Sequence, residues 1–313
     1  MKQNELYTEI NKVIYNLLSS PLVYEKSWLN LNAGLPKNSY SHKMYKGVNL
    51  FMLSITSILE GWANNTFMTY KQIHELGGKV KKGSHTTPIY FYDVLFFDKN
   101  GQKYPAKDVD IMSEQVKAAL GISKRPYLKK FRVFNIVADT ENLPEEFYYL
   151  PQLQIISPVE INQRAHDILI STGAEVRIAA SNSAHYSPQN DIIQLPDLRQ
   201  FKDTEHFYSV VFHELAHWTG HNTRLNRKNG KEFGDRDYAF EELVAELASA
   251  YVCGLLGFQS KITNNAAYIK EWLKALDNEP RFFVKAARKA EEAAAFILKN
   301  YEVPQIERFV WAA

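Results

Sequence analysis

The spacing of apolar residues changes along the chain and predicts helices first and strands later. From Leu6 to Leu17 apolar residues recur at intervals of three and four, so we expect an amphipathic helix over residues 2–19. Pro21 follows this stretch, and proline cannot continue a helix. The same period predicts a helix at residues 49–63 and another at residues 69–76, the second ending at Gly77-Gly78.

An extended pattern replaces the helical one after this point. Residues 88–97 are rich in Tyr, Phe, Ile and Val, and Asn100-Gly101 follows them as a turn signal. A shorter run at residues 131–137 has the same character. These runs predict strands, so the first part of the chain is expected to be α+β.

The second part of the chain has a mainly helical pattern. Its expected helices and short strands cover residues 158–171, 176–180, 192–195, 205–218, 238–256, 266–276 and 280–300. Proline and acidic residues gather at residues 142–146 and at Pro151, which marks a break in composition. We therefore expect a first domain over residues 1–140, a linker over residues 141–155 and a mainly helical second domain over residues 156–313.

Composition excludes several classes of protein. The chain has 313 residues, of which 45% are hydrophobic and 23% charged, as in ordinary globular proteins rather than disordered ones. The longest uncharged runs, residues 47–59 and 247–260, are too short to span a bilayer. The first residues lack the apolar core of a signal peptide, and Cys253, the one cysteine, cannot form an internal disulfide. We expect a soluble protein of a reducing compartment, the cytoplasm, with no membrane partner.

Charge is distributed unevenly between the two parts. Residues 1–135 hold 19 basic against 10 acidic residues, whereas the remainder holds 18 against 25. Lys71, Lys79, Lys81 and Lys82 lie near Tyr70, and basic residues interleaved with aromatic ones are typical of single-stranded nucleic-acid binding. The alternative is a lysine-rich surface that only solubilises the protein, above aromatic residues that serve packing.

The stretch His213-Glu214-Leu215-Ala216-His217 forms an H-E-x-x-H pattern. On a helix His213 and His217 lie one turn apart on one face, where both imidazoles can bind one divalent metal. Glu214 can then serve as general base toward a water at the metal. The pattern also arises by chance, but the apolar residues around it are typical of a buried helix.

A third ligand is expected from the next predicted helix. Glu242 and Glu246 share one of its faces, and we expect Glu242 to bind the metal while Glu246 accepts the second ring N–H of a ligand histidine. Glu241 is the alternative ligand, unless it is a solvated helix position.

Four further residues have weaker signals. His221 has the helical phase of a ligand, but Gly220 can end the helix before it, so a capping or second-shell role is favoured. Tyr186 and Tyr238 are candidate hydroxyl donors to an oxyanion, with ordinary packing as the favoured alternative. Cys253 is expected to be a buried small hydrophobe.

Several longer stretches resemble the ArdC-type antirestriction proteins of plasmids and conjugative elements. In the second part these are HELAHWTGHNTRLNR at residues 213–227, YAFEELVAEL at 238–247 and AAYIKEWL at 266–273. In the first part, shorter matches include YKGVN at residues 45–49 and GGKVKKG at residues 77–83. The resemblance covers nearly the whole chain and implies an N-terminal single-stranded-DNA-binding domain followed by a zincin-like metallopeptidase domain.

The resemblance also implies roles for individual residues. It implies His213, His217 and Glu242 as ligands of zinc, or of another divalent metal such as manganese, and Glu214 as the catalytic carboxylate. It places DNA binding in the first domain, where Lys46 and Asn49 join the lysines around Tyr70 as expected contacts. The leading hypothesis is a mobile-element antirestriction protein that binds single-stranded DNA and acts on a protein or peptide substrate. A DNA-binding protein with a structural or vestigial metal site and a dedicated metalloprotease are the alternatives.

Overall fold

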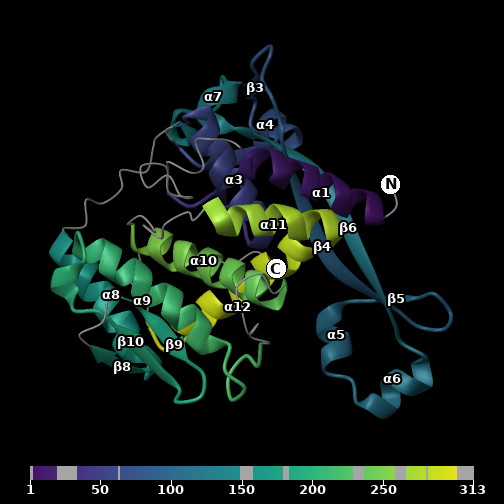
Figure 1. Cartoon of the computed structure of the whole chain (residues 1–313). Coiled ribbons are helices and arrows are strands. Elements are labelled where there is room, and N and C mark those ends of the chain that lie inside the picture. Colours follow the sequence, from purple (N-terminus) through teal and green to yellow (C-terminus); the bar gives the residue numbers. More distant parts are fainter. Residues whose placement is uncertain are drawn as a thin grey trace.

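The structure is a computed structural model, which describes residues 3–19, 34–62, 64–148, 158–178, 183–227, 236–257, 266–279 and 281–301. Figure 1 shows a helical body on one side and a long two-stranded ribbon that runs away from it. The expectation of an α+β first part followed by a mainly helical second part is confirmed. None of the described helices is long and apolar enough to cross a membrane.

The first part is built on a five-stranded sheet of order β1-β2-β6-β4-β5. Its strands are β1 (Lys37–Asn38), β2 (Thr66–Thr69), β4 (Thr87–Phe97), β5 (Lys103–Tyr104) and β6 (Ser123–Asn135). β4 and β6 pair antiparallel along their full length, from Thr87 opposite Val133 to Phe97 opposite Ser123. We call this pair the β4–β6 ribbon.

The strand expected at residues 88–97 is confirmed, but the one expected at residues 131–137 is wrong at both ends. β6 begins at Ser123, and the chain leaves it at Asn135 for the short helix α7 (Ile136–Asp139). The Asn135 side chain accepts the backbone N–H of Ala138, which caps that helix and ends the strand. The early part of β6 is basic rather than apolar, so hydrophobic periodicity could not reveal it.

The expected early helices are confirmed as α1 (Gln3–Leu18), α3 (Gly47–Glu60) and α4 (Tyr70–Glu75). Thr69 caps α4 together with Gln72, each side chain bonding the other residue's backbone. Between β4 and β6 the chain also forms α5 (Ala106–Asp110) and α6 (Glu114–Leu120), and β3 (Lys79–Val80) pairs with β7 (Thr140–Glu141). Pro21 lies outside the described residues.

The second part consists of helices over a small sheet. Its helices are α8 (Pro158–Thr172), α9 (Thr204–Thr219), α10 (Arg236–Leu256), α11 (Ala266–Asn278) and α12 (Phe282–Leu298), all of them expected. The sheet has the order β8-β10-β9, with β8 (Glu175–Ile178), β9 (His185–Ser187) and β10 (Ile192–Leu195). Strands β8 and β10 were expected; the short β9 was not.

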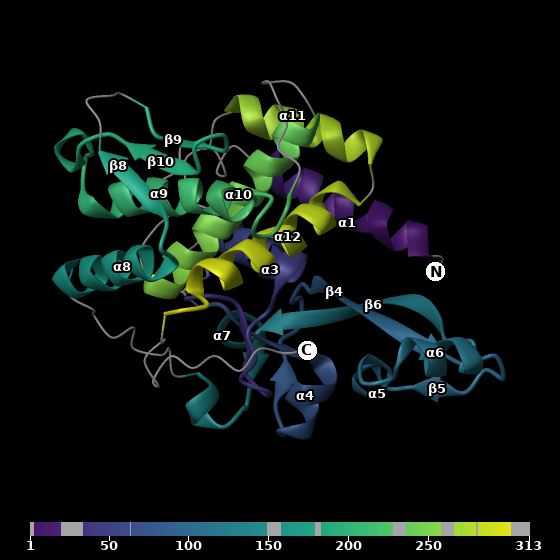
Figure 2. The ribbon, with the colours of Figure 1, turned by 90° about the horizontal axis from the view of Figure 1, so that it is seen from below.

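The first and second parts share one large hydrophobic cluster, and two smaller clusters lie within the first part. Helices α1 and α3 pack against α10, α11 and α12, as Figures 1 and 2 show from two directions. The rings of Phe51 on α3 and Phe283 on α12 lie 4.6 Å apart, and Asn11 on α1 donates to the carbonyl of Leu276 on α11. Both expected domains therefore contribute to one continuous cluster, and residues 149–155 of the expected linker lie outside the described residues.

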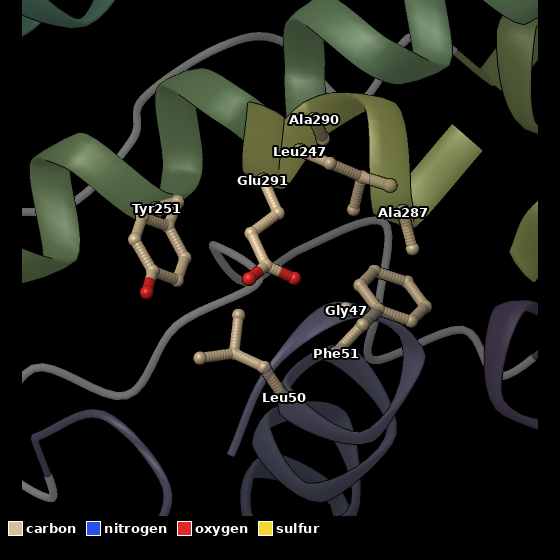
Figure 3. Close-up of a pocket in the computed structure, with 8 residues that line it drawn as sticks. All are labelled: Gly47, Leu50, Phe51, Leu247, Tyr251, Ala287, Ala290 and Glu291. Atoms are coloured by element: carbon tan, nitrogen blue, oxygen red, sulfur yellow. The ribbon is translucent and has the colours of Figure 1, made fainter. Parts of the chain in front are cut away.

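Helices α3, α10 and α12 surround a small pocket (Figure 3). Tyr251, Leu50 and Phe51 surround the Glu291 carboxylate, and Glu291 pairs with Lys46 at 3.5 Å. The ammonium group of Lys46, a residue expected at DNA, thus pairs with helix α12.

Candidate metal centre

Helix α9 presents His213 and His217 on one face. Asp203 caps the helix by accepting the backbone N–H of His206, and the opposite face buries Val211, Phe212 and Leu215 in the core. The Nε2 atoms of the two histidines lie 3.1 Å apart, and their side chains are only 13% and 15% exposed. Both ring nitrogens thus face one point at the edge of the core.

Helix α10 adds the third donor, Glu242. Its Oε2 lies 3.6 Å from Nε2 of His213, and its Oε1 lies 3.6 Å from Nε2 of His217. Donor atoms of these three residues all lie within 4.8 Å of one another. Small residues let the helices approach this closely, and the Ser249 hydroxyl on α10 donates to the carbonyl of Ser209 on α9.

Glu241 lies on the other side of His217, outside this donor group. Its Oε1 is 3.4 Å from Nδ1 of His217. Arg227 holds the carboxylate with two bonds, from Nε at 2.9 Å and from Nη2 at 2.6 Å. A carboxylate at Nδ1 keeps the proton there and leaves the Nε2 lone pair for a metal. The structure therefore favours Glu242 over the alternative ligand Glu241, which is buried rather than solvated.

Arg227 is the residue that sequence reasoning missed. Besides Glu241 it bonds the hydroxyl of Thr219 and the carbonyl of Ala216, both at the end of α9. Gly220 makes room for it, because a Cβ at that position would lie 2.9 Å from Nη2 of Arg227. A signal was present in the sequence: two adjacent buried carboxylates, Glu241 and Glu242, require positive partners, and one metal serves only one of them.

The electrostatics of the centre suit a cation. Burial lowers the pKa of His213, but the hydrogen bond to Glu242 and the charges of Glu246 and Glu214 outweigh it and raise that pKa well above its usual value. Burial and the charge of Glu242 raise the pKa of Glu246. Four buried carboxylates, those of Glu214, Glu241, Glu242 and Glu246, thus lie around two imidazoles.

Two further observations test whether these residues fit a metal. Nδ1 of His213 is buried and accepts or donates no hydrogen bond within the described structure; Oε1 of Glu246 lies 4.0 Å away. Two imidazole nitrogens and one carboxylate are a donor set that divalent zinc or manganese accepts. Glu246 was expected to accept the second ring N–H of a ligand histidine, but its distance from His213 Nδ1 is longer than a hydrogen bond, and Glu241 lies at Nδ1 of His217 instead. Glu214 is buried next to His213.

The weaker candidates lie at different distances from the centre. Helix α9 ends at Thr219, and the ring of His221 faces Thr223 at 2.8 Å, outside the donor group. Tyr186 donates to Asp191, which also pairs with Arg224, so Tyr186 belongs to a structural network. Tyr238 is hydrogen-bonded to Glu242.

Cys253 has the environment expected of a small buried residue. It is fully buried on α10, and burial raises the pKa of its thiol. A nucleophilic cysteine has a lowered pKa and access to solvent, and Cys253 has neither.

Known proteins match both parts of the chain. A family model described as a zincin-like metallopeptidase matches residues 163–289, and one described as the N-terminal domain of the anti-restriction factor ArdC matches residues 4–134. The protein y4eC of Sinorhizobium fredii (strain NBRC 101917 / NGR234) is 31% identical over 260 residues, which are 83% of this chain and 79% of that protein. The chain belongs to the ArdC-type antirestriction family.

Solved structures of an ArdC protein agree with this assignment. The crystal structure of the antirestriction ArdC protein from plasmid R388 in its metal-free form has a TM-score of 0.72 and 29% identity, and covers 95% of this chain and 97% of its own. The Mn(II)-bound form of that protein has a TM-score of 0.69 and 28% identity, with 96% and 98% covered.

Two curated ArdC relatives are much longer. Two Escherichia coli proteins named DNA primase TraC are each 34% identical over 303 residues. The chain spans 20% of the length of one and 27% of the other.

The residues expected at DNA lie in the ArdC N-terminal part with differing exposure. Asn49 bonds both the carbonyl and the N–H of Tyr90 at 2.7 Å, so its side chain joins α3 to β4. Lys81 donates to the carbonyl of Ala138 at the end of α7.

The remaining expected contacts are exposed. Tyr70 is 62% exposed and stacks on His74. Lys71 pairs with Glu75 at the surface, and Lys79 and Lys82 are exposed. These four side chains are accessible to a ligand.

Proposed function

We propose that this protein is a cytoplasmic mobile-element antirestriction protein that binds single-stranded DNA and hydrolyses peptide bonds at a divalent metal held by His213, His217 and Glu242. The observation that carries the peptidase part is the convergence of those three donors within 4.8 Å beside the buried Glu214. The Mn(II)-bound structure of a related protein supports a metal at this place, and we propose zinc as the ion, with manganese as the alternative.

The residues of the chain have distinct parts in the proposed reaction. When bound, the metal would polarise a peptide carbonyl and make a water molecule more acidic. Glu214 takes a proton from the attacking water and passes it to the leaving amine. Glu241 and Arg227 hold the ring of His217, and Tyr238 holds the carboxylate of Glu242.

The DNA-binding part rests on charge and on the family. The basic excess lies in residues 1–135, and the match to the ArdC N-terminal domain lies in residues 4–134. In the proposed complex Tyr70, Lys71, Lys79, Lys81 and Lys82 contribute to the DNA surface, whereas Lys46 and Asn49 contribute through the internal contacts described above.

Glu214→Gln in the full chain tests the peptidase part. We expect the variant to bind one equivalent of zinc or manganese as the wild type does, and to lose hydrolysis of an unfolded protein such as casein. Retained hydrolysis would contradict the role of Glu214. No hydrolysis by the metal-loaded wild type under any condition would contradict the peptidase proposal and favour a structural metal site.

A titration of the full chain with fluorescent oligothymidylate and duplex DNA at several salt concentrations tests the DNA part. We expect tighter binding of the single strand and a steep loss of affinity with salt. Absence of binding at low salt would contradict this part.

A further inference from the structure

One face of the β4–β6 ribbon carries exposed aromatic side chains. Residues paired across the ribbon share a face, so the pairs Ile89–Phe131, Phe91–Lys129 and Asp93–Tyr127 lie together on one side. Phe91 is 41% exposed, and Tyr127 and Phe131 are each 37% exposed. Three large rings at one solvent-facing surface are unusual for residues that serve packing.

The opposite face of the ribbon is covered by the helical body. There the Tyr90 ring is 3% exposed and its backbone bonds Asn49 of α3, while Lys130 forms an ion pair with Glu9 of α1. Figure 2 shows α1 and α3 on one side of the ribbon. The other side, near the body, packs through Ile89 and Val133 against Leu53 of α3. Beyond Ile89 the side with Phe91, Tyr127 and Phe131 is open, and we call this part the outer face.

The three rings of the outer face surround a lysine. Phe131 and Tyr127 flank Lys129 along β6, each two residues away and so about 6.4–6.8 Å along the strand. Phe91 lies directly across from Lys129 on β4. The Lys129 ammonium lies 4.9 Å from the centre of the Phe131 ring. A cation thus stands between three flat apolar surfaces.

The charge of the ribbon has one dominant sign. β6 holds five basic residues and no acidic one, and Asp93 is the one acidic residue of β4. On the outer face Arg125 continues the basic line, 4.6 Å from the centre of the Phe97 ring. A ligand that fits this face needs both negative charges and flat apolar groups, which are the properties of a nucleic-acid strand with unpaired bases.

We propose that the outer face is a stacking platform for single-stranded DNA, with bases on Phe91, Tyr127 and Phe131 and phosphates at Lys129 and Arg125. The proposal rests on the single-stranded DNA binding proposed above and assigns it to a surface. Bases paired in a duplex are already stacked and cannot lie on these rings, which gives the preference for single strands.

The exposed Tyr70 extends this path. Thr69, the last residue of β2, pairs with Val133 of β6, and Val133 is two residues from Phe131. Tyr70 follows immediately as the first residue of α4. The backbone therefore brings Tyr70, with Lys71 beside it, to the same end of β6 as Phe131, with the buried Val133 between them.

The triple variant F91A/Y127A/F131A of the full chain tests the stacking contacts. Loss of one stacked base costs roughly 1–3 kcal/mol, or roughly 5- to 150-fold in Kd, so the triple variant should raise the Kd for oligothymidylate at least tenfold. Y15A is the control, because Tyr15 is 43% exposed and belongs to α1 rather than to the ribbon. Thermal unfolding of both variants is measured alongside, because the three rings are 37–41% exposed and their removal also takes away packing contacts.

A second pair of variants separates stacking from charge. R125Q/K129Q should flatten the dependence of log Kd on log salt by about 1.4, at about 0.7 per phosphate contact with a single strand. K202Q/K270Q, which removes two exposed lysines of the second part, should leave the slope unchanged. F131L keeps apolar area without an aromatic face and should behave like F131A.

The outcomes separate this inference from the function on which it rests. Failure of the wild type to bind oligothymidylate contradicts the proposed function. If F91A/Y127A/F131A keeps the wild-type affinity and K79Q/K81Q/K82Q loses it, the outer face is not the DNA-binding surface. The proposed function then stands, and the DNA binds near β3. Equal affinity of F131L and wild type, with F131A weaker, contradicts stacking and indicates a face that binds apolar protein groups.

Discussion

The candidate metal centre and the outer face differ in how the chain surrounds their charges. At the centre every carboxylate and imidazole is largely buried and faces a group of opposite charge or a ring nitrogen, such as Glu241 between Arg227 and His217. On the outer face the cations are exposed beside aromatic rings. In a buried site of this kind, removal of one partner leaves a charge unpaired, so stability and metal affinity depend on each residue. On an exposed face the affinity for DNA is the sum of several similar contacts.

The strongest test of this difference removes metal ligands. Loss of a group that merely orients a ligand costs about 10- to 100-fold in metal affinity, so the double variant H213A/H217A should lose more than that. Calorimetric titration with zinc and manganese measures the loss. The same variant should keep its affinity for oligothymidylate, and a parallel loss of DNA binding would show that the two regions depend on each other.

The next test concerns the buried ion pair behind His217. The side chains of Arg227 and Glu241 are 4% and 5% exposed, so R227A leaves a buried carboxylate without its cation and should lower the free energy of unfolding by about 3–5 kcal/mol. Urea denaturation measures it.

The double substitution R227M/E241L provides the matched control for R227A. It removes both charges together and should unfold at nearly the wild-type urea concentration. It should still bind metal more weakly, because His217 has lost the group that orients it. If R227M/E241L is destabilised as much as R227A, the cost of R227A does not come from the unpaired charge of Glu241.

A smaller effect is expected from one methyl group at Gly220. The Cβ of G220A would lie 2.9 Å from Nη2 of Arg227 and 3.0 Å from the carbonyl oxygen of His217, which should cost about 1–3 kcal/mol in unfolding free energy. Because the strain is directed at Arg227, G220A/R227A should be less destabilised than the sum of the single variants. If the losses of unfolding free energy in G220A and R227A simply add in the double variant, the added methyl group does not strain Arg227.

The smallest effect is expected at the network of Asp191, whose side chain is 39% exposed. The hydrogen bond from Arg224 lowers the pKa of Asp191 below its usual value. Its contribution to stability is therefore complete above a pH of about 4 and is lost as the pH falls through the lowered pKa. D191N, whose asparagine tolerates the positive φ of this position, should show a stability deficit that shrinks in acid. D197N, which removes one charge of the exposed Asp197–Arg199 pair, should show almost no loss of stability.

Local patterns predicted the helices and the donors of the metal centre. The three-four period located α9 and α10, and the spacing within them was enough to expect His213 and His217 to converge with a carboxylate of α10, for which Glu241 stayed the alternative to Glu242. The helices and the donors depend on residues that are close in sequence or share one helix face. The period of the hydrophobic pattern shows such relations directly.

The rest depends on contacts between distant segments. The outer face arises because Phe91 pairs with Lys129, a register that no local pattern in the basic stretch before Phe131 revealed. Likewise Lys46 and Asn49 looked like surface residues, but Glu291 and Tyr90 bind them from other elements. The partners of these residues lie far away in the sequence. A single sequence gives the residues but not which distant residues they contact.

The contact between α1 and α11 has a consequence for protein synthesis. The bond from Asn11 to Leu276 joins residues 265 positions apart, and a ribosome adding roughly 5–20 residues per second takes roughly 13–50 s to span that interval. During that time the apolar face of α1, which includes Ile10 and Ile14, has emerged while its partner helix does not yet exist. A nascent chain of this protein therefore offers chaperones an apolar helix face that stays uncovered until α11 has been synthesised.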